Sequence, residues 1–307
     1  MRMNSKKVLF IVGPTGSGKS ELALQLARKL RGEIISADSM QVYRGMDIGT
    51  DKPSKWLRHR VRHHLLDVVS PSDEFSVYEY RQRVLDVLES VLRRKKFPIV
   101  VGGTGLYIKS IVDGISPQPG KNEGVRDKLR STAQGKGPDF LYGRLKQADP
   151  EVASRIHPHD EKRIIRALEV WEISGKKLSD WEKETVPLAE LGYQYWMIGI
   201  YRRREELYER IDHRVDSMFH KGLVRETRRL SKKSLSLTAR QAIGYRELFD
   251  CFEGRLSLEE ARRLIKQHTR NLAKRQIIWF KKDSRIEWLN SLEDKRLTEI
   301  VGKIKHV

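Results

Sequence analysis

Residues 13–20 have the types and the spacing of a loop that binds phosphate groups. They read Gly-Pro-Thr-Gly-Ser-Gly-Lys-Ser and fit the pattern G-x-x-x-x-G-K-S. Glycines allow consecutive backbone N–H groups to point at one anion, and a helix that starts there adds positive potential. The lysine adds a point charge, and the serine hydroxyl can hold Mg²⁺. We therefore predict that a phosphate chain is bound by Gly13, Pro14, Thr15, Gly16, Ser17, Gly18, Lys19 and Ser20, with Ser20 as metal ligand.

Two predicted elements must position this loop. Residues 8–12 form a short apolar run, which predicts a buried strand, and residues 21–30 carry leucines at helical spacing. A strand, a glycine-rich loop and a helix in this order are the context in which the pattern is typical of a phosphate site.

Two further apolar runs predict strands that end beside this loop. Residues 33–37 are followed by Asp38, and residues 99–101 are followed by Gly102-Gly103-Thr104-Gly105. Ligands of parallel sheets bind outside the carboxyl ends of the strands, so Asp38 is placed for chemistry. An Asx turn or a helix cap explains an aspartate there equally well. The second strand ends without the acidic residue of a hydrolysing P-loop protein, which argues against a plain ATPase or kinase.

Residues 113–122 are rich in Pro and Gly, and the chain from there to about residue 190 predicts helices. The strand signal returns at residues 195–201. It precedes an Arg-rich helical stretch in which Arg203, Arg210 and Arg214 are candidates to close over the phosphates, although a solvated helix face with pairs such as Glu206–Arg210 is the alternative.

These elements predict an α/β protein with a P-loop NTPase-like parallel sheet flanked by helices. We place this core domain, with its C-terminal helices, at residues 1–118 and 191–307. Residues 119–190 form an all-helical insertion domain in this prediction.

The chain of 307 residues is strongly basic, with 61 Lys and Arg against 41 Asp and Glu and a net charge of +20. Ten Lys or Arg and three Asp or Glu lie between residues 255 and 285. Such a concentration favours a polyanionic partner, most simply a nucleic acid, over a surface that is merely solvated.

A single cysteine, Cys251, excludes an internal disulfide and a Cys-rich zinc site, which fits a reducing cytoplasm. Neither a signal-peptide core nor an apolar run long enough for a membrane span is present in the sequence. We expect a cytoplasmic protein that does not associate with membranes.

The whole sequence resembles the tRNA dimethylallyltransferases. Six separate motifs carry the resemblance: GPTGSGKS at 13–20, ISADSMQVYRGMDIGTDKP at 35–53, VGGTGLY at 101–107, RIHPHDEKRIIRALEV at 155–170, QAIGYRE at 241–247 and LAKRQIIWF at 272–280. The ordered set is far more specific than the P-loop alone. The sequence lacks the C-terminal zinc-finger extension of eukaryotic members, so we expect a bacterial-type enzyme.

The resemblance implies transfer of a dimethylallyl group from dimethylallyl diphosphate to N6 of adenosine 37, in the anticodon loop of tRNAs that read codons starting with U. The products would be N6-(dimethylallyl)adenosine and diphosphate. It further implies Mg²⁺ as cofactor, residues 13–20 as diphosphate site and a tRNA-binding role for the insertion domain. We also expect a monomer.

The resemblance also implies roles for single residues. Asp38 matches the general base that takes the N6 proton, Arg214 matches an arginine that contacts the diphosphate, and Lys19 and Thr104 complete the predicted catalytic set. The residues that match tRNA contacts are Asp38, Ser39, Met40, Gln41, Thr104, Arg126, Lys162, Arg163, Ile164, Ile165, Arg166, Gln241, Ala242, Ile243, Gly244, Tyr245 and Arg246.

Two alternatives remain open from the sequence. A P-loop kinase shares the expected fold but leaves the net charge and the non-acidic strand end at residues 101–104 unexplained. A non-catalytic RNA-binding P-loop protein explains the charge but gives Asp38 no task.

Overall fold

The computed structural model describes residues 6–290 and 295–306 of the chain. It divides into two compact units, residues 1–112 with 189–307 and residues 113–188. The sequence placed these boundaries at residues 118/119 and 190/191, inside the connecting segments. Among the described residues, no helix is both long enough and apolar enough to cross a membrane.

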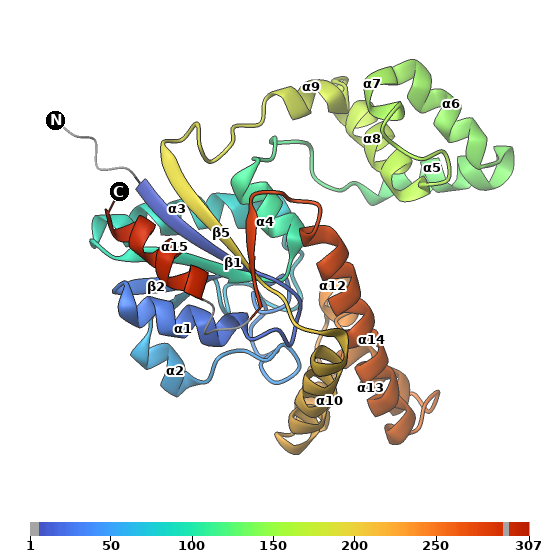
Figure 1. Cartoon of the computed structure of the whole chain (residues 1–307). Helices are drawn as coiled ribbons and strands as arrows, with labels where there is room; N and C mark the ends of the chain where they lie inside the picture. The colour runs from blue at the N-terminus through green and yellow to red at the C-terminus, as the bar shows by residue number, and fades with distance from the viewer. Residues whose placement is uncertain (1–5, 291–294, 307) are drawn as a thin grey trace. The chain divides into compact units, whose positions relative to one another are not determined.

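The first unit is built on one sheet of six strands (Figure 1). In chain order they are β1 (Lys6–Val12), β2 (Gly32–Ser36), β3 (His63–His64), β4 (Phe97–Gly102), β5 (Tyr193–Ile200) and β6 (Ile286–Leu289). The spatial order is β3-β2-β4-β1-β5-β6, and every pair is parallel. The predicted fold class is confirmed.

Helices cover both faces of this sheet. The helices of the unit are α1 (Lys19–Lys29), α2 (Lys55–Arg60), α3 (Val77–Arg93), α4 (Gly105–Val112), α10 (Arg204–His220), α11 (Leu223–Leu230), α12 (Leu237–Arg240), α13 (Tyr245–Phe252), α14 (Leu258–Phe280) and α15 (Lys295–His306). Alternate strand residues such as Leu9, Ile99 and Ile198 share a buried cluster with α1 and α15. Helices α3 and α4 pack on each other over the opposite face (Figure 1).

The second unit is entirely helical among its described residues. It contains α5 (Glu123–Lys136), α6 (Pro138–Ala148), α7 (Pro150–Ala153), α8 (Glu161–Ser174) and α9 (Leu178–Lys183). Its own apolar cluster includes Leu129, Leu141, Leu145 and Leu168, so the unit has an independent core. Helix α9 was not predicted from the sequence.

The sequence also missed β3, α4 and α15. Strand β3 is only two residues long, and such a segment carries no periodicity from which a strand can be predicted. Its two histidines are structural, because His63 contacts the carbonyl of Val61 at 2.7 Å and His64 contacts Glu33 at 2.6 Å. Helix α4 begins at Gly105, directly after the glycines that follow β4.

The ends of β1 and β4 form the opening in which a ligand can bind. The helix after β1 packs on one face of the sheet and the helix after β4 packs on the other, so the chain diverges between these neighbours. This arrangement is the switch point at which open α/β sheets bind their ligands. Gly102 permits it, because a Cβ atom there would lie 2.0 Å from the carbonyl oxygen of Ala37 in β2's continuation.

We expect Gly102→Ala to lower the free energy of unfolding by about 1–3 kcal/mol, because the added methyl group overpacks the contact with Ala37. Urea denaturation measures the change. Gly302→Ala is the matched control, since no atom lies within 4 Å of a Cβ there. In the helical context of α15 that control should be stabilising by about 0.5–1 kcal/mol. Equal effects of the two substitutions would contradict the packing argument.

Candidate active site

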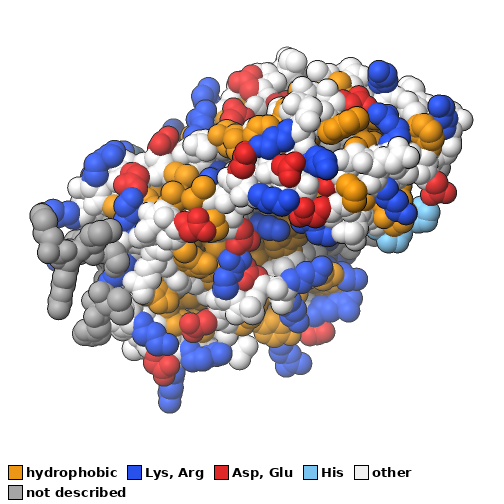
Figure 2. Space-filling model, turned by 90° about the horizontal axis from the view of Figure 1, so that it is seen from above, with side chains coloured by type: hydrophobic (Ala, Val, Ile, Leu, Met, Phe, Trp, Pro, Cys, Tyr) orange, Lys and Arg blue, Asp and Glu red, His pale blue; other side chains and the backbone are white. Residues whose placement is uncertain are grey.

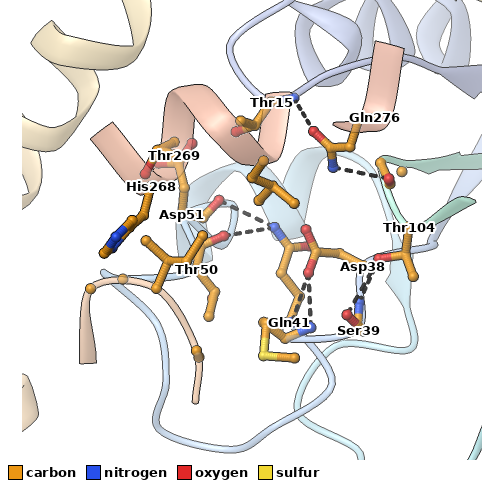
Figure 3. A pocket seen from close by; sticks show the side chains of 18 of the residues that line it. Thr15, Asp38, Ser39, Gln41, Thr50, Asp51, Thr104, His268, Thr269 and Gln276 are labelled. Carbon is orange, nitrogen blue, oxygen red and sulfur yellow. Dashed lines mark hydrogen bonds between the residues drawn. The ribbon is translucent and has the colours of Figure 1, made fainter. Parts of the chain in front are cut away.

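A cavity of about 760 Å³ opens at the carboxyl ends of the strands (Figure 3). Its walls come from four parts of the first unit: the loop before α1, the ends of β2 and β4, helices α10 and α14, and the turn before α13. Among the lining residues are Thr15, Lys19, Ser20, Asp38, Ser39, Met40, Gln41, Asp51, Thr104, Arg214, Gln241, Ala242, Ile243, Gly244, Arg246 and Gln276. Predicted residues that are far apart in the sequence therefore share one cavity.

The loop of residues 13–18 has the backbone conformation of an anion cradle. Gly13, Gly16 and Gly18 have φ values of 142°, 81° and 98°, in the region that favours glycine. Helix α1 starts directly after the loop, so its amino terminus faces the same space. The hydroxyl of Ser17 is buried and has no hydrogen-bond partner among the described residues.

Three cationic side chains donate hydrogen bonds to carbonyl oxygens of this loop. Lys19 Nζ donates to the carbonyl of Pro14 at 2.8 Å, Arg210 Nε to that of Gly16 at 2.9 Å, and Arg202 Nε to that of Ser17 at 2.7 Å. Their charge lies around the cradle, and the loop carbonyls are turned away from the space that the N–H groups face.

Arg214 reaches the loop from α10. Its Nη1 lies 2.9 Å from the hydroxyl oxygen of Thr15 and 3.4 Å from the carboxylate of Asp51. Burial, and next the charge of Arg214, lower the pKa of Lys19 to about 8. A site with two cations this close is prepared for a multiply charged anion.

Among the predicted arginines, Arg210 and Arg214 thus lie at the loop, whereas Arg203 caps α10 without a side-chain hydrogen bond. Arg202, which the sequence did not single out, contacts the loop instead. Arg202 also pairs with Glu206, so the predicted pair Glu206–Arg210 is not the one that forms.

Asp38 follows β2 and faces the cavity. Its Oδ1 accepts the backbone N–H groups of Met40 at 2.9 Å and Gln41 at 3.4 Å, which is the Asx turn considered from the sequence. Among the described residues, no hydrogen bond reaches Oδ2. The turn and the chemical role are therefore compatible, because one oxygen fixes the carboxylate and the other is available to a substrate.

Thr104 and Gln41 hold the turn that contains Asp38. Thr104 Oγ1 accepts the N–H of Ser39 at 3.0 Å, and Gln41 Nε2 donates to the carbonyl of Thr50 at 3.0 Å (Figure 3). The ends of β2 and β4 and the loop after β2 are thereby joined around the carboxylate.

Gln276 on α14 is a site residue that the sequence analysis did not identify. Its Oε1 accepts the N–H of Thr15 at 2.8 Å, and its Nε2 donates to the carbonyl of Gly103 at 2.9 Å (Figure 3). A Cβ on Gly103 would lie 2.3 Å from this amide, so the glycine is needed for the approach. The only signal in the sequence was its position inside the LAKRQIIWF motif.

The loop of residues 46–51 is held by a buried carboxylate that the sequence also did not reveal. Glu226 accepts the N–H groups of Asp47, Ile48 and Gly49 at 3.1, 2.9 and 3.1 Å. The hydroxyl of Tyr245 donates to it at 2.7 Å, and burial keeps the pKa of Tyr245 well above its usual value. The predicted substrate contact at Tyr245 is therefore a packing position, since the side chain is fully buried.

The turn before α13 presents Gln241, Ile243 and Arg246 to the cavity. Arg246 Nη2 lies 2.6 Å from Glu247, whose other carboxylate oxygen accepts the N–H of Gly244 at 2.7 Å. This pairing orients the guanidinium beside the cavity but leaves it partly exposed.

In the second unit, Arg126 and Arg166 are engaged with a buried carboxylate. Arg126 Nε and Arg166 Nη1 lie 2.8 and 2.7 Å from Glu169, whose side chain is inaccessible to solvent. Burial alone would raise the pKa of Glu169, but hydrogen bonds from both arginines hold it below its ordinary value. The two arginines of α8 that match tRNA contacts therefore differ: Arg163 is largely exposed, whereas Arg166 is used inside the unit.

The second unit has a cavity of its own. It is lined by Arg126, Arg130, His157, His159, Asp160, Glu161, Lys162 and Ile165. Ile164 and Ile165 are buried in the apolar cluster of the unit, so their side chains serve packing first. Of the predicted tRNA-binding cations of this unit, Lys162 lines the cavity and is exposed, and Arg163 is exposed beside it in the sequence.

The basic segment 255–285 offers less free charge than its sequence suggested. Three of its cations pair with carboxylates of α10: Arg270 with Asp212, and Arg262 and Lys266 with Asp216, at 2.7–2.8 Å. They join α14 to α10 and so position Arg214. Figure 2 shows that Lys and Arg side chains are spread over the visible face of the molecule with Asp and Glu among them, rather than gathered in one stripe.

Ser20 is the candidate for a metal contact. It is exposed at the cavity, which also contains Asp38 and Asp51. Within residues 6–290 and 295–306, no three His, Cys, Asp or Glu side chains are grouped as a metal cluster. A single hydroxyl with two carboxylates in the same cavity fits an ion that keeps most of its water ligands and takes others from substrate phosphates. Mg²⁺ has this preference.

Comparison with known proteins identifies the family of the chain. The sequence profile described as IPP transferase matches residues 41–283. The chain belongs to this family. The tRNA dimethylallyltransferase of Halothermothrix orenii is 45% identical over 290 residues, which cover 94% of this chain and 88% of the relative.

Solved structures of the family share the fold. The tRNA isopentenylpyrophosphate transferase of Bacillus halodurans aligns with a TM-score of 0.71 and 36% identity, over 98% of this chain and 97% of that one. A eukaryotic dimethylallyltransferase acting on tRNA aligns with a TM-score of 0.79 and 31% identity, over 96% of this chain and 78% of that one.

We expect Gln276→Leu to weaken the binding of inorganic diphosphate about tenfold, equivalent to about 1.4 kcal/mol, because the loop loses its link to the end of β4. Isothermal titration calorimetry measures the affinity. Gln267→Leu, at an exposed position of the same helix, is the control and should bind like the wild type. Unchanged affinity of Gln276→Leu would remove this residue from the site.

We expect the affinity for inorganic diphosphate to fall as the pH rises above about 8, since Lys19 loses its charge there. Below that pH the ammonium group is protonated and contributes fully. Lys19→Arg keeps a positive charge at every pH tested, so its affinity should lose this additional decrease. Identical pH profiles of the two proteins would show that Lys19 does not titrate in this range.

Proposed function

We propose that the protein transfers a dimethylallyl group from dimethylallyl diphosphate to N6 of adenosine 37 in the anticodon loop of tRNAs that read codons starting with U. The products are N6-(dimethylallyl)adenosine and diphosphate. One observation carries the proposal: a carboxylate with a free oxygen and a cradle for a phosphate chain line one cavity, whose β4 end has glycines where a hydrolysing P-loop protein has an acid.

The phosphate cradle stabilises the leaving group of this reaction, which is diphosphate. When the bond between C1 of the allylic group and the diphosphate oxygen breaks, negative charge grows on the diphosphate. Backbone N–H groups at the amino terminus of α1, together with Lys19 and Arg214, are fixed around that position before the reaction starts. Preorganised donors of this kind stabilise a transition state more than they stabilise the bound substrate.

Mg²⁺ is part of the proposal as a cofactor. When bound, it neutralises charge on the diphosphate oxygens. Ser20 would be the protein ligand, with water and the diphosphate supplying the remaining ligands. Lys19 and Arg214, which line the same cavity, would act in the same direction.

Asp38 activates the nucleophile, which is N6 of the adenine. The lone pair of the adenine amino group is delocalised into the ring, so N6 attacks well only if its proton is removed as the new N6–C1 bond forms. Oδ2 of Asp38 is available to accept that proton, while the backbone N–H groups of Met40 and Gln41 hold Oδ1. Thr104 keeps the turn in place through Ser39. This is general-base catalysis by a positioned carboxylate.

The target base must leave the stack of the anticodon loop to enter the cavity, which costs least in a loop. The rim residues Ser39, Met40, Gln241, Ile243 and Arg246 are the proposed contacts to the flipped base and its neighbours. In the second unit we propose Lys162 and Arg163 as contacts to the phosphate backbone, since both are exposed.

A P-loop kinase is the second candidate, because the cradle by itself also suits a nucleotide. The kinase gives Asp38 a role only if another acid organises the metal at the end of β4. The residues there are Gly102, Gly103 and Thr104, and both glycines are needed for close contacts. The prenyl transfer therefore accounts for more of the site.

We expect Asp38→Asn to slow prenyl transfer by about 10²–10⁴-fold, the usual contribution of a general base, with little change in tRNA affinity. The assay combines protein, Mg²⁺, dimethylallyl diphosphate and unmodified tRNA, and then weighs the nucleosides after digestion. Asp86→Asn, at an exposed position on α3, is the control. Full activity of Asp38→Asn would remove Asp38 as the base, and phosphotransfer from ATP without prenyl transfer would favour the kinase.

A further inference from the structure

The opposite edge of the sheet, where the strands begin, carries a second concentration of positive charge. Three short segments precede three strands: residues 28–31 before β2, residues 58–62 before β3 and residues 93–96 before β4. They contain three, three and four Lys or Arg residues, respectively, and no Asp or Glu. Since β3, β2 and β4 are neighbours in the sheet, the three segments meet at one edge.

The strand register places individual cations side by side. Gly32 pairs with Phe97, so Arg31 and Lys96 both directly precede paired residues. The backbone N–H of Ile34 donates to the carbonyl of Arg62 at 2.9 Å. Neighbouring strands lie about 4.8 Å apart, so these three side chains originate within about two strand spacings of one another.

These cations are available to a partner. Arg28, Lys29, Arg31, Arg62, Arg93, Lys95 and Lys96 are exposed. Among the described residues, none of them forms an ion pair with a carboxylate. Two acidic groups lie at this edge. Glu33 is buried and already neutralised by Arg94 and His64, and Glu89 is paired with Lys6 and accepts a hydrogen bond from Tyr193.

Two of the cations stand where glycine is the usual residue. Arg31 and Lys95 have φ values of 51° and 55°, in the left-handed region, just after α1 and α3. Glycine is favoured in this conformation because it has no Cβ. The turns therefore keep a long cationic side chain at some conformational cost.

An exposed aromatic ring belongs to the same edge. Trp56 on α2 is 58% exposed, and the guanidinium carbon of Arg60 lies 3.9 Å from the centre of its ring. Arg60 and Arg62 lie directly before β3. An exposed aromatic ring beside arginines can stack on a base as well as support phosphate contacts.

We propose that this surface, the amino-edge surface formed by residues 28–31, 56–62 and 93–96, binds the phosphate backbone of an RNA helix at a site separate from the cavity. The two sites lie at opposite ends of the strands. β2 alone has five residues, so about 16 Å of sheet separates the edges at 3.3 Å per residue. The contact is one of charge and shape and does not read base sequence.

RNA fits this surface better than an anionic membrane does. Arginines predominate over lysines in it, and their planar guanidinium groups suit bidentate contacts to phosphate oxygens. Trp56 is the only large apolar side chain within these segments that is exposed, whereas a membrane-binding surface presents a wider apolar face. The inference uses the proposed function only in choosing RNA as the first polyanion to test.

The test measures binding of the full-length protein to a 20-base-pair RNA duplex without a loop, by fluorescence anisotropy at about 50–200 mM salt. We expect Arg31→Glu/Lys96→Glu/Arg62→Glu to weaken binding at least tenfold. The slope of log affinity against log salt should fall by about three, since each lost phosphate contact removes close to one unit. The control Lys221→Glu/Lys232→Glu/Lys233→Glu has the same charge change at exposed positions elsewhere and should change affinity less than threefold.

The rate of prenyl transfer to an anticodon stem–loop is measured in parallel. It should stay within twofold of the wild-type rate in both triple variants, because this reaction depends on the cavity and not on the amino-edge surface. The corresponding glutamine variant replaces the glutamate variant if the latter melts at a lower temperature. Equal duplex binding by the amino-edge variant and the control overturns the proposal. Loss of binding to phosphatidylserine vesicles with unchanged duplex binding overturns it in favour of a membrane.

Discussion

The site depends on the way the backbone of residues 13–18 is held open. A glycine-rich turn can point its N–H groups inward only if its carbonyl groups find partners elsewhere. Lys19, Arg210 and Arg202 provide these partners at Pro14, Gly16 and Ser17. Each positive side chain satisfies a carbonyl from outside and adds potential to the same space. One set of contacts thus shapes the cradle and gives it charge.

Close contacts also determine which residues can stand at the end of β4. Its glycines lie against Ala37 on one side and Gln276 on the other, so α14 can approach the strand ends closely. A side chain at Gly102 would meet the backbone of Ala37, and one at Gly103 would meet the amide of Gln276. The close packing at Gly102 therefore disfavours the usual acid of a hydrolytic P-loop protein there, and the site is directed toward a different use of the phosphate chain.

The sequence predicted the parts of this arrangement that are local. The P-loop, the helix that follows it and the buried strands that begin near residues 8, 33, 99 and 195 follow from periodicity and turn chemistry. The parallel sheet follows from their alternation. Gln276 and Glu226 could not be found in this way, because each acts on backbone groups more than 170 residues away. A polar residue on a helix does not reveal in its own neighbourhood which distant backbone group it will meet.

The net charge of a segment could be predicted from the sequence, but the partners of its charged side chains could not. The net excess over residues 255–285 suggested a surface for a polyanion, yet Arg262, Lys266 and Arg270 fasten α14 to α10. Conversely, each of the cationic segments before β2, β3 and β4 is too short for the sequence alone to indicate a binding surface. They form a surface only when the strand order places them together.

The carboxylate of Glu226 has a consequence for the order in which the molecule is made. Residues 47–49 are held by a side chain almost 180 positions later in the chain, and Tyr245 follows later still. During synthesis the amino-terminal strands and their helices leave the ribosome well before this clasp exists. The loop beside Asp38 can settle only after α11 and α13 have been translated. Arg202 and Arg210, which hold the carbonyl groups of the cradle, are themselves translated only after β5, so the cradle and the loop beside Asp38 are completed at nearly the same stage of synthesis.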